Sequence, residues 1–395
     1  MKLFRVNEIA GWKRGLVAAL LAGAITSVYA EGFRFGLMGD HRGYNQKTNV
    51  NDTQTAYKDG GITKPVLISL ATALGRENLE FVLDVGDMAT KWQKGYFASS
   101  VTSNSLMAAE LADWASLWIA NSGNLPIYPV RGNQEVSAAP EVWRAFTATL
   151  PGISTLPLNG SAGEEGLTYA FNYKNCLFVG IDQYVSPLAN NDSHVITPQA
   201  LAWLKWVIPQ SDHKFVFGHA PAFEVWNPAT VATKTAIKDG LASPYALFNA
   251  ESLAQRNAFW DLLGKHRANY FCGHDHIYTR ALCADTRGEW VRQVIIGDGG
   301  APAPAMFSTV YDTLGWFAEA YAGIPFPTVA GFSYQLERPL VLMESMPMFV
   351  SGTTRTYGFG YVVIDVHGSK VTAKYMAEPT DGGEFVEMDS WTIAK

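Results

Sequence analysis

The sequence predicts an α/β protein built around one large domain. From Phe33 onward, short runs rich in β-branched and aromatic residues alternate with longer runs of helical period, which is the pattern of strands connected by helices. Hydrophobic residues make up 48% of the 395 positions and charged residues 17%, so the chain can form a large core and is not of the disordered class. No period recurs along the chain, which argues against a repeat protein.

Each expected element has local signals at its ends. Thr197 is expected to be the N-cap of a helix that has Pro198 at its first position, and Gly75 and Gly264 are expected to end two other helices. Strands end where glycine or polar residues interrupt the apolar runs. We expect strands over 33–38, 81–85, 127–130, 176–182, 214–217, 269–272, 291–296, 361–366 and 371–376, and helices over 65–74, 106–121, 198–208 and 252–263.

The first thirty residues are typical of a signal peptide. Positive charges between Lys2 and Arg14 precede an apolar run over 15–25, and Ala30 completes a small-residue cleavage signal. The alternative is a membrane anchor, but the run is shorter than the ~20 apolar residues that span a bilayer. We therefore expect residues 1–30 to be removed and the protein to be exported, periplasmic or extracellular, with no stable membrane insertion.

The remaining residues, 31–395, are expected to form the single domain. Residues 301–352 are rich in proline, glycine and aromatic residues without a clear period, and we expect an irregular insertion or lid there. Residues 353–395 return to strand-type alternation and are expected to complete a sheet. The cysteines Cys176, Cys272 and Cys283 are too few for a disulfide scaffold, although Cys272 and Cys283 could pair across a hairpin.

The charge balance argues against a polymeric nucleic acid as partner. The formal net charge is -6, with 30 basic and 36 acidic residues, and no basic run forms the stripe that a phosphate backbone requires. We therefore expect a small-molecule substrate. The composition does not determine the oligomeric state.

Residues of metal-ligand type follow five of the expected strands. In each case the apolar run ends on a glycine, which lets the backbone turn sharply, and the ligand type comes next. Because functional loops gather at the carboxyl ends of parallel strands, these side chains should converge. They are Asp40, Asp87, Asn133, His219 and His274, with His276 two residues further on.

The chemistry of this set indicates transition-metal ions. Two carboxylates, one amide oxygen and three imidazoles suit Fe, Mn, Zn or Co and contain too much nitrogen for a calcium or magnesium cage. Six ligands fit two ions better than one structural zinc. A metal pair about 3.5–4 Å apart, bridged by a carboxylate, is the arrangement used for in-line phosphoryl displacement.

In their order along the chain, these motifs resemble those of the calcineurin-like metallophosphoesterases, and most closely those of purple acid phosphatases. The resemblance implies a two-sheet mixed β-sandwich flanked by helices, with residues 31–395 as the metallophosphoesterase domain. The motifs are Gly39-Asp40, Gly86-Asp87, Gly132-Asn133-Gln134-Glu135, Gly218-His219-Ala220-Pro221 and Gly273-His274-Asp275-His276, followed by Tyr278, Arg280 and Gly299-Gly300-Ala301-Pro302.

The resemblance also implies a role for each ligand. Two divalent or trivalent ions would share the site, with a bridging hydroxide that attacks the phosphorus of a small phosphate mono- or diester. Asp87 would bridge the ions, Asp40 and His276 would bind the first ion, and Asn133, His219 and His274 would bind the second. Apart from the resemblance, Glu135 and Asp275 lie next to ligand residues in the sequence and are expected to orient the neighbouring loops or ligands.

Three positions depart from the family pattern. Gln134 stands at the catalytic position of a histidine, where it can donate a hydrogen bond but cannot transfer a proton. Arg42 replaces a metal-binding histidine, and Thr90 replaces the tyrosine that colours purple enzymes. We expect His41 and Arg42 to contact the substrate, with Arg42 as a phosphate clamp.

Two functional hypotheses follow from these residues. The first is an exported metal-dependent phosphoesterase of acid phosphatase or phosphodiesterase type. The alternative is a non-catalytic metal-binding or ligand-binding protein on the same fold, which Gln134 and Arg42 favour. All six residues of metal-ligand type are present, however. A protein that had lost its catalytic activity would not need to keep all of them, so the sequence favours the enzyme.

Overall fold

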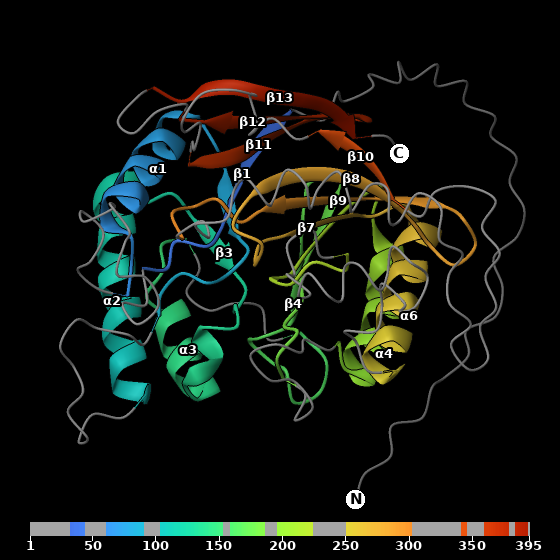
Figure 1. The fold of residues 1–395 in the computed structure, drawn as a ribbon, viewed down its shortest axis with the longest axis horizontal. Coiled ribbons are helices and arrows are strands. Elements are labelled where there is room, and N and C mark those ends of the chain that lie inside the picture. Colours follow the sequence, from blue (N-terminus) through green and yellow to red (C-terminus); the bar gives the residue numbers. More distant parts are fainter. Residues whose placement is uncertain are drawn as a thin grey trace, which may run out of the picture.

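The computed structural model describes residues 32–43, 61–90, 103–152, 159–185, 196–223, 250–301, 341–345, 359–378 and 384–393. Two mixed β-sheets lie face to face, with helices on their outer faces (Figure 1). The predicted α/β class with a two-sheet sandwich is therefore confirmed. The expected signal peptide lies outside the described residues. Within them, no helix has the length and apolarity to cross a bilayer.

The first sheet combines parallel and antiparallel strands. Its strand order within the described residues is β13-β12-β11-β1-β2-β3. β1, β2 and β3 are parallel, whereas β11 is antiparallel to β1 and begins the antiparallel run that ends with β13. The bounds are β1 Phe33–Met38, β2 Phe81–Asp84, β3 Ile127–Pro129, β11 Gly360–His367, β12 Lys370–Ala377 and β13 Val386–Ile393.

The second sheet also has a parallel centre. Its order within the described residues is β10-β8-β9-β7-β6-β5-β4. β5, β6, β7 and β9 are parallel, whereas β4 pairs antiparallel with β5, β8 with β9, and β10 with β8. The bounds are β4 Tyr169–Tyr173, β5 Cys176–Gly180, β6 His213–Phe217, β7 Asn269–Cys272, β8 Tyr278–Ala284, β9 Trp290–Ile296 and β10 Val341–Ser345.

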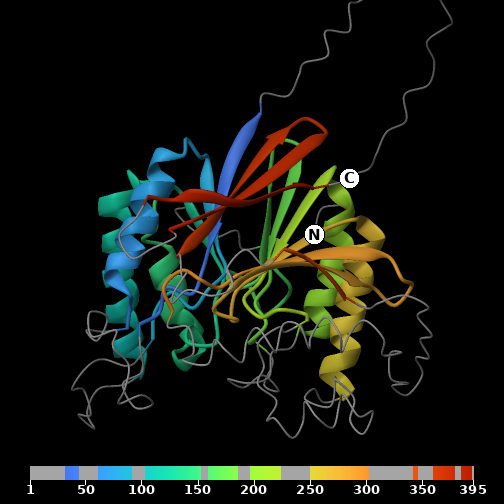
Figure 2. The ribbon, with the colours of Figure 1, turned by 45° about the horizontal axis from the view of Figure 1, so that its top comes forward.

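Helices cover the outer face of each sheet (Figure 2). α1 (Lys64–Arg76), α2 (Ser103–Ser122) and α3 (Pro140–Thr147) pack on the first sheet, and α4 (Pro198–Val207) and α6 (Ala250–His266) pack on the second. The side chain of Thr197 accepts a hydrogen bond from the Ala200 amide at 3.0 Å, so α4 begins at the predicted cap.

The predicted ends of two helices are wrong. α1 continues through Gly75 to Arg76, and α6 continues through Gly264 to His266. A Cβ at Gly75 would lie 2.8 Å from the Ser122 carbonyl oxygen, and one at Gly264 would overlap the Asp285 carboxylate. These glycines therefore allow close packing of neighbouring segments and do not cap their helices.

Aromatic side chains fill the space between the sheets. Phe35 of the first sheet meets Phe178 and Phe215 of the second edge-on, with ring centroids 5.0 Å apart in both pairs. Phe81 meets Phe178 at 5.1 Å in the same way. Such pairs stabilise a core beyond the area they bury, so the sheets are held in a fixed relation and their strand ends with them.

The segment 301–352 and the pair Cys272 and Cys283 can both be compared with the structure. Within the segment expected to be irregular, β10 forms a strand that pairs with β8, while residues 302–340 and 346–358 lie outside the described part of the chain. Cys272 and Cys283 are buried and form no disulfide with each other. They do not face each other across a hairpin, because β7 and β8 pair with opposite edges of β9.

Asp298, in the loop after β9, ties the two sheets together. Its side chain is buried, and its Oδ2 accepts a hydrogen bond from the Tyr375 hydroxyl of β12. Burial raises the pKa of Asp298 from 3.8 to about 7, because the charged form loses its hydration.

This shift predicts a pH dependence of stability. The unfolded chain releases the proton near pH 4 and the folded chain near pH 7, so ionisation costs the folded state as pH rises through that interval. Compared with Asp298→Asn, the wild-type free energy of unfolding should fall by up to about 4 kcal/mol between pH 4 and pH 8, measured by urea denaturation. Tyr375→Phe should steepen the fall, and parallel curves for wild type and Asp298→Asn would contradict the assignment.

Candidate metal centre

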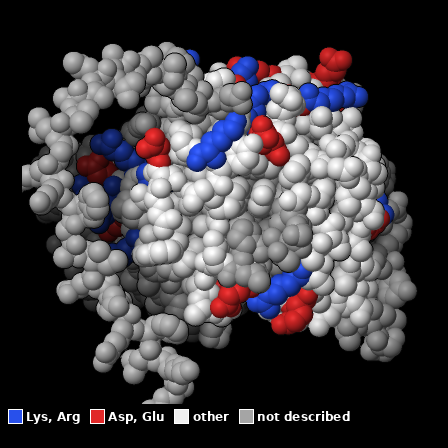
Figure 3. Space-filling view, turned by 180° about the vertical axis from the view of Figure 1, so that it is seen from behind, with Lys and Arg blue, Asp and Glu red and all other residues white. Residues whose placement is uncertain are grey.

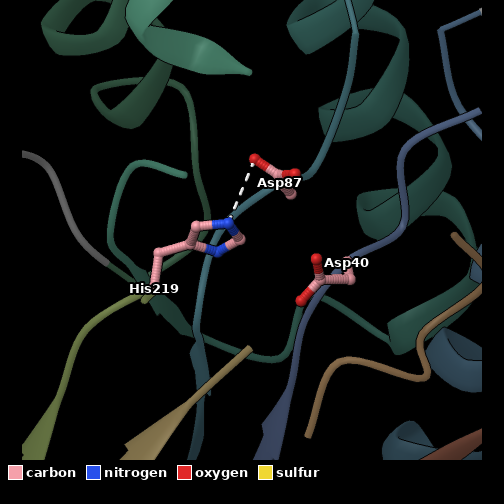
Figure 4. Close-up of side chains that lie close together, drawn as sticks. All are labelled: Asp40, Asp87 and His219. Carbon is pink, nitrogen blue, oxygen red and sulfur yellow. Dashed lines mark ion pairs between the residues drawn. The ribbon is translucent and has the colours of Figure 1, made fainter. Parts of the chain in front are cut away.

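The parallel strands of both sheets end at one edge of the sandwich, where the predicted ligands lie. Asp40 follows β1, Asp87 follows β2 and Asn133 follows β3, while His219 follows β6 and His274 follows β7. Ligand atoms of Asp40, Asp87 and His219 lie within 4.8 Å of one another, although they come from two sheets (Figure 4). The structure thus brings the predicted strand-end residues together.

The backbone at this edge adopts left-handed conformations. Asp40, Asp87 and His274 have φ angles of 59°, 53° and 69°, which non-glycine residues adopt at a cost. Hydrogen bonds hold them there. The Asp40 amide donates to the Gly86 carbonyl at 2.8 Å, and the His274 amide donates to Asp40 Oδ2 at 2.9 Å. The strained turns therefore aim the side chains into the site.

Two glycines leave room for the carboxylates. A Cβ at Gly132 would overlap Oδ1 of Asp87, and one at Gly273 would overlap Oδ2 of Asp40. Each glycine belongs to a loop other than that of the carboxylate it accommodates. Gly132, before Asn133, is thus required for the close approach of the Asp87 carboxylate, and Gly273, before His274, for that of the Asp40 carboxylate.

Glu135 fastens two of the ligand loops. Its buried carboxylate accepts hydrogen bonds from the amides of Asp87 at 3.1 Å, Ala89 at 3.1 Å and Gly132 at 2.7 Å. Burial raises the pKa of Glu135 to about 8, and the charge of Asp87 contributes to the rise. The loops after β2 and β3 are therefore bound to one side chain, which is the orienting role expected from the sequence.

His219 presents a lone pair to the site. Its Nδ1 lies 2.8 Å from the Val85 carbonyl oxygen. Because a carbonyl oxygen can only accept a hydrogen bond, the proton of the neutral ring is assigned to Nδ1. Its Nε2 then lies 3.3 Å from Asn133 Oδ1, 3.3 Å from His274 Nδ1 and 3.4 Å from Asp87 Oδ1. Burial lowers the pKa of His219, which favours the neutral, ligating form.

Acceptor atoms of several side chains meet in this space. Oδ1 of Asp40 is buried with no hydrogen-bond partner within the described residues, and the Asn133 amide oxygen faces only acceptors. Rotating the amide would let it donate to Asp87 at 3.0 Å, whereas a cation would satisfy all these atoms together. Burial raises the pKa of Asp40 well above its usual range, and the charge of Asp87 raises it further. The donor set fits a metal ion.

Arg42 lies inside the cluster. Its Nε is 3.1 Å from Asp87 Oδ2, and its Nη2 is 3.1 Å from Nε2 of His276. The same His276 nitrogen is 3.6 Å from Oδ1 of Asp40. The structure therefore joins His276 to the site on the side of Asp40, and the arginine lies among the ligands and not at an outer rim.

His41 and Gln134 differ in where they lie relative to the cluster of Asp40, Asp87 and His219. His41 is fully buried, with its ring 5.9 Å from Trp114 of α2 and its Nδ1 3.4 Å from Asp84 Oδ2, so the structure does not bring it to the Asp40, Asp87 and His219 cluster. Burial lowers the pKa of His41 to about 3. Gln134 is partly exposed, and its backbone amide donates a hydrogen bond to Asp87 Oδ1 at 3.0 Å.

Two residues near His219, Gln183 and Tyr184, are not among those that the sequence predicted. The Tyr184 ring lies 6.1 Å from the His219 ring, and its buried hydroxyl has no hydrogen-bond partner in the described ranges. The Gln183 side chain accepts from the Ala220 amide at 2.7 Å and donates to the Ala220 carbonyl at 3.0 Å, which positions the His219 loop. Both follow β5, another parallel strand, and that position could have indicated them.

Comparisons with known proteins gave solved structures only. No family model matches the chain, and no curated protein does. A dimetal phosphatase from Danio rerio is 12% identical over 92% of this chain and 98% of its own, with a TM-score of 0.49. A calcineurin-like phosphoesterase from Bacillus subtilis is 12% identical over 91% and 89%, with a TM-score of 0.32, and a predicted phosphoesterase from Streptococcus pneumoniae is 8% identical over 91% and 98%, with a TM-score of 0.28.

The space that Gly132 leaves for Asp87 gives a test of the site. Gly132→Ala should displace the Asp87 carboxylate and weaken metal binding by at least ~tenfold, because a Cβ there overlaps Oδ1. Titration with Mn²⁺ followed by calorimetry measures the change. Gly163→Ala is the control for general destabilisation away from the site, because a Cβ there meets nothing within 4 Å but the φ of 86° strains an alanine. Equal affinities in the two variants would rule out this role for Gly132.

Proposed function

We propose that this chain is a metal-dependent phosphoester hydrolase of the calcineurin-like metallophosphoesterase superfamily. The observation that carries the proposal is the environment of His219. Its Nδ1–H donates a hydrogen bond to the Val85 carbonyl, and its Nε2 faces an amide oxygen, an imidazole nitrogen and a carboxylate oxygen at 3.3–3.4 Å. Such an inward convergence of lone pairs is what a metal centre requires.

The ligand residues form two groups, each of which would bind one ion. Asp87 faces His219 with Oδ1 and the Arg42 side with Oδ2, which suits a bridging carboxylate. His219, Asn133 and His274 would hold one ion, and Asp40 and His276 the other. When bound, the ions would polarise phosphoryl oxygens and lower the pKa of bound water to about 7.

The polar groups beside the ligands suit a phosphate. The Arg42 guanidinium supplies positive charge, and the Gln134 side chain can donate a hydrogen bond to a phosphoryl oxygen but cannot protonate a leaving group. The substrate we propose is a small phosphate mono- or diester, since the net charge of -6 and the absence of a basic run in the sequence do not favour a polymeric nucleic acid. The similarity to purple acid phosphatases stays a prediction.

Export is part of the proposal. Its support is the sequence of residues 1–30, with basic residues, a short apolar run and Ala30 before Glu31. An exported phosphoesterase would act on esters outside the cytoplasm, in the periplasm or the extracellular medium.

Metal content and turnover together test the proposed activity. The purified protein should bind Mn, Zn, Fe or Co and hydrolyse p-nitrophenyl phosphate or bis-p-nitrophenyl phosphate, with loss of turnover after chelation. Asp87→Ala should lose both ions and all measurable turnover, because it removes the bridging ligand. Asp113→Ala is the control, since Asp113 is a partly exposed carboxylate paired with Lys64. Metal binding without turnover on either ester would refute the enzyme and favour the non-catalytic alternative.

The position of Gln134 predicts a dependence on the leaving group. Gln134→His should raise turnover of alkyl phosphates by about tenfold or more and change aryl phosphates little, because protonation matters most for a basic leaving group. The backbone amide of residue 134 donates a hydrogen bond to Asp87, so an imidazole side chain at this position would lie close to the metal ligands. Gln210→His, on the surface after α4, is the matched control. Equal effects on both ester classes would exclude a role in proton transfer.

A further inference from the structure

We infer that Arg42 is a built-in cation that competes with a metal ion for the half of the centre formed by Asp40 and His276, so that the two halves bind metal with unequal affinity. This inference deepens the proposed function and rests on its metal centre. It concerns the order in which the centre fills, which follows from where the guanidinium group lies.

The contacts of Arg42 use the lone pairs that an ion would need. A guanidinium group has five N–H donors and no acceptor, so His276 Nε2, at 3.1 Å from Nη2, must be the acceptor. The Nε atom of Arg42 lies 3.1 Å from Asp87 Oδ2 as an ion pair and has no hydrogen-bond partner within the described residues. An ion held by Oδ2 of Asp87 and Nε2 of His276 would therefore have to displace both contacts.

The half of the centre around His219 differs in this respect. The contacts found around its Nε2 are with Asn133 Oδ1, His274 Nδ1 and Asp87 Oδ1, all of which are atoms that can ligate a metal. Its Nδ1 is fixed by Val85, so the ring is already oriented. An ion entering this half displaces no cation, and we expect it to bind first and more tightly.

The backbone of Arg42 is anchored while its side chain can leave. The Arg42 amide donates to the Asp87 carbonyl at 2.9 Å, its carbonyl accepts from the Thr63 hydroxyl at 3.1 Å, and the residue forms a β-bridge with Ile62. The side chain is 21% exposed, whereas Asp87 and Asp40 are buried. A second ion can therefore move the guanidinium outward without disturbing the loop.

Repulsion between the guanidinium and an ion would be large here. Solvent screens charges poorly when the groups around them are buried, so two cations among these carboxylates interact strongly. A guanidinium displaced toward solvent remains next to the centre, where it can bind phosphate oxygens in a bidentate way. Arg42 would thus lower the affinity for the second ion and offer the freed group to an anion.

Calorimetric titration of the metal-stripped full chain with Mn²⁺ tests the inference. The wild type should show one tight site and a second that is at least ~tenfold weaker. Arg42→Gln, which removes the charge and keeps a polar side chain, should strengthen the weaker site by at least ~tenfold and leave the tight site nearly unchanged. Arg34→Gln is the matched control, because Arg34 lies at the opposite end of β1 and pairs with Glu77.

A second variant keeps the test decisive if Arg42→Gln does not fold. Arg42→Lys retains the charge but replaces the fork with one ammonium group, which cannot reproduce both contacts, so the weak site should strengthen by a smaller factor. Two sites of equal affinity in the wild type, no effect of either substitution, or no bound Mn²⁺ would overturn the inference. Unequal sites that depend on Arg42, without hydrolysis of any ester, would support it and refute the proposed function.

Discussion

The carboxylates of Asp40 and Asp87 are buried together where the two sheets end, and the rest of the site is arranged around that constraint. Two negative charges in a poorly hydrated space repel each other, and this repulsion adds to the burial that raises the pKa of Asp40. Removing the carboxylates from water is a cost that only cations and N–H donors can offset. Arg42, the amides of His274 and Gln134, and the proposed metal ions all serve that need.

The scaffold holds the carboxylates in place despite this cost. The aromatic rings between the sheets fix the strand ends of one sheet against those of the other, and short loops extend from those ends. Glu135 then fastens the loops after β2 and β3, and Gln183 fastens the loop that carries His219. Charged residues are sparse on the face opposite to the view of Figure 1, where most of the described surface is uncharged (Figure 3).

Much of this arrangement could be predicted from residue order, because hydrophobic alternation marks strands and a ligand type after a terminal glycine marks the functional edge. The directions of individual side chains could not. After Asp40, whose φ of 59° departs from the strand, alternation no longer indicates where a side chain points, so His41 lies beside Trp114 and Arg42 reaches Asp87. Tyr184 was missed because β5 ends without a glycine–ligand pair. Gly75 and Gly264 resemble helix-capping glycines, and only the contacts with Ser122 and Asp285 distinguish packing from capping.

The pairing of β1 has a consequence for how the chain acquires its structure. β1 lies between β2 and β11, and Phe33 is registered with Val366, near the opposite end of the sequence. Contacts between such distant residues form slowly, because a very long loop must close before they contribute. During synthesis, the strand that precedes Asp40 emerges long before its antiparallel neighbour and exposes an unpaired edge in the meantime. A chaperone that shields this edge would raise the yield of folded protein without touching the finished site.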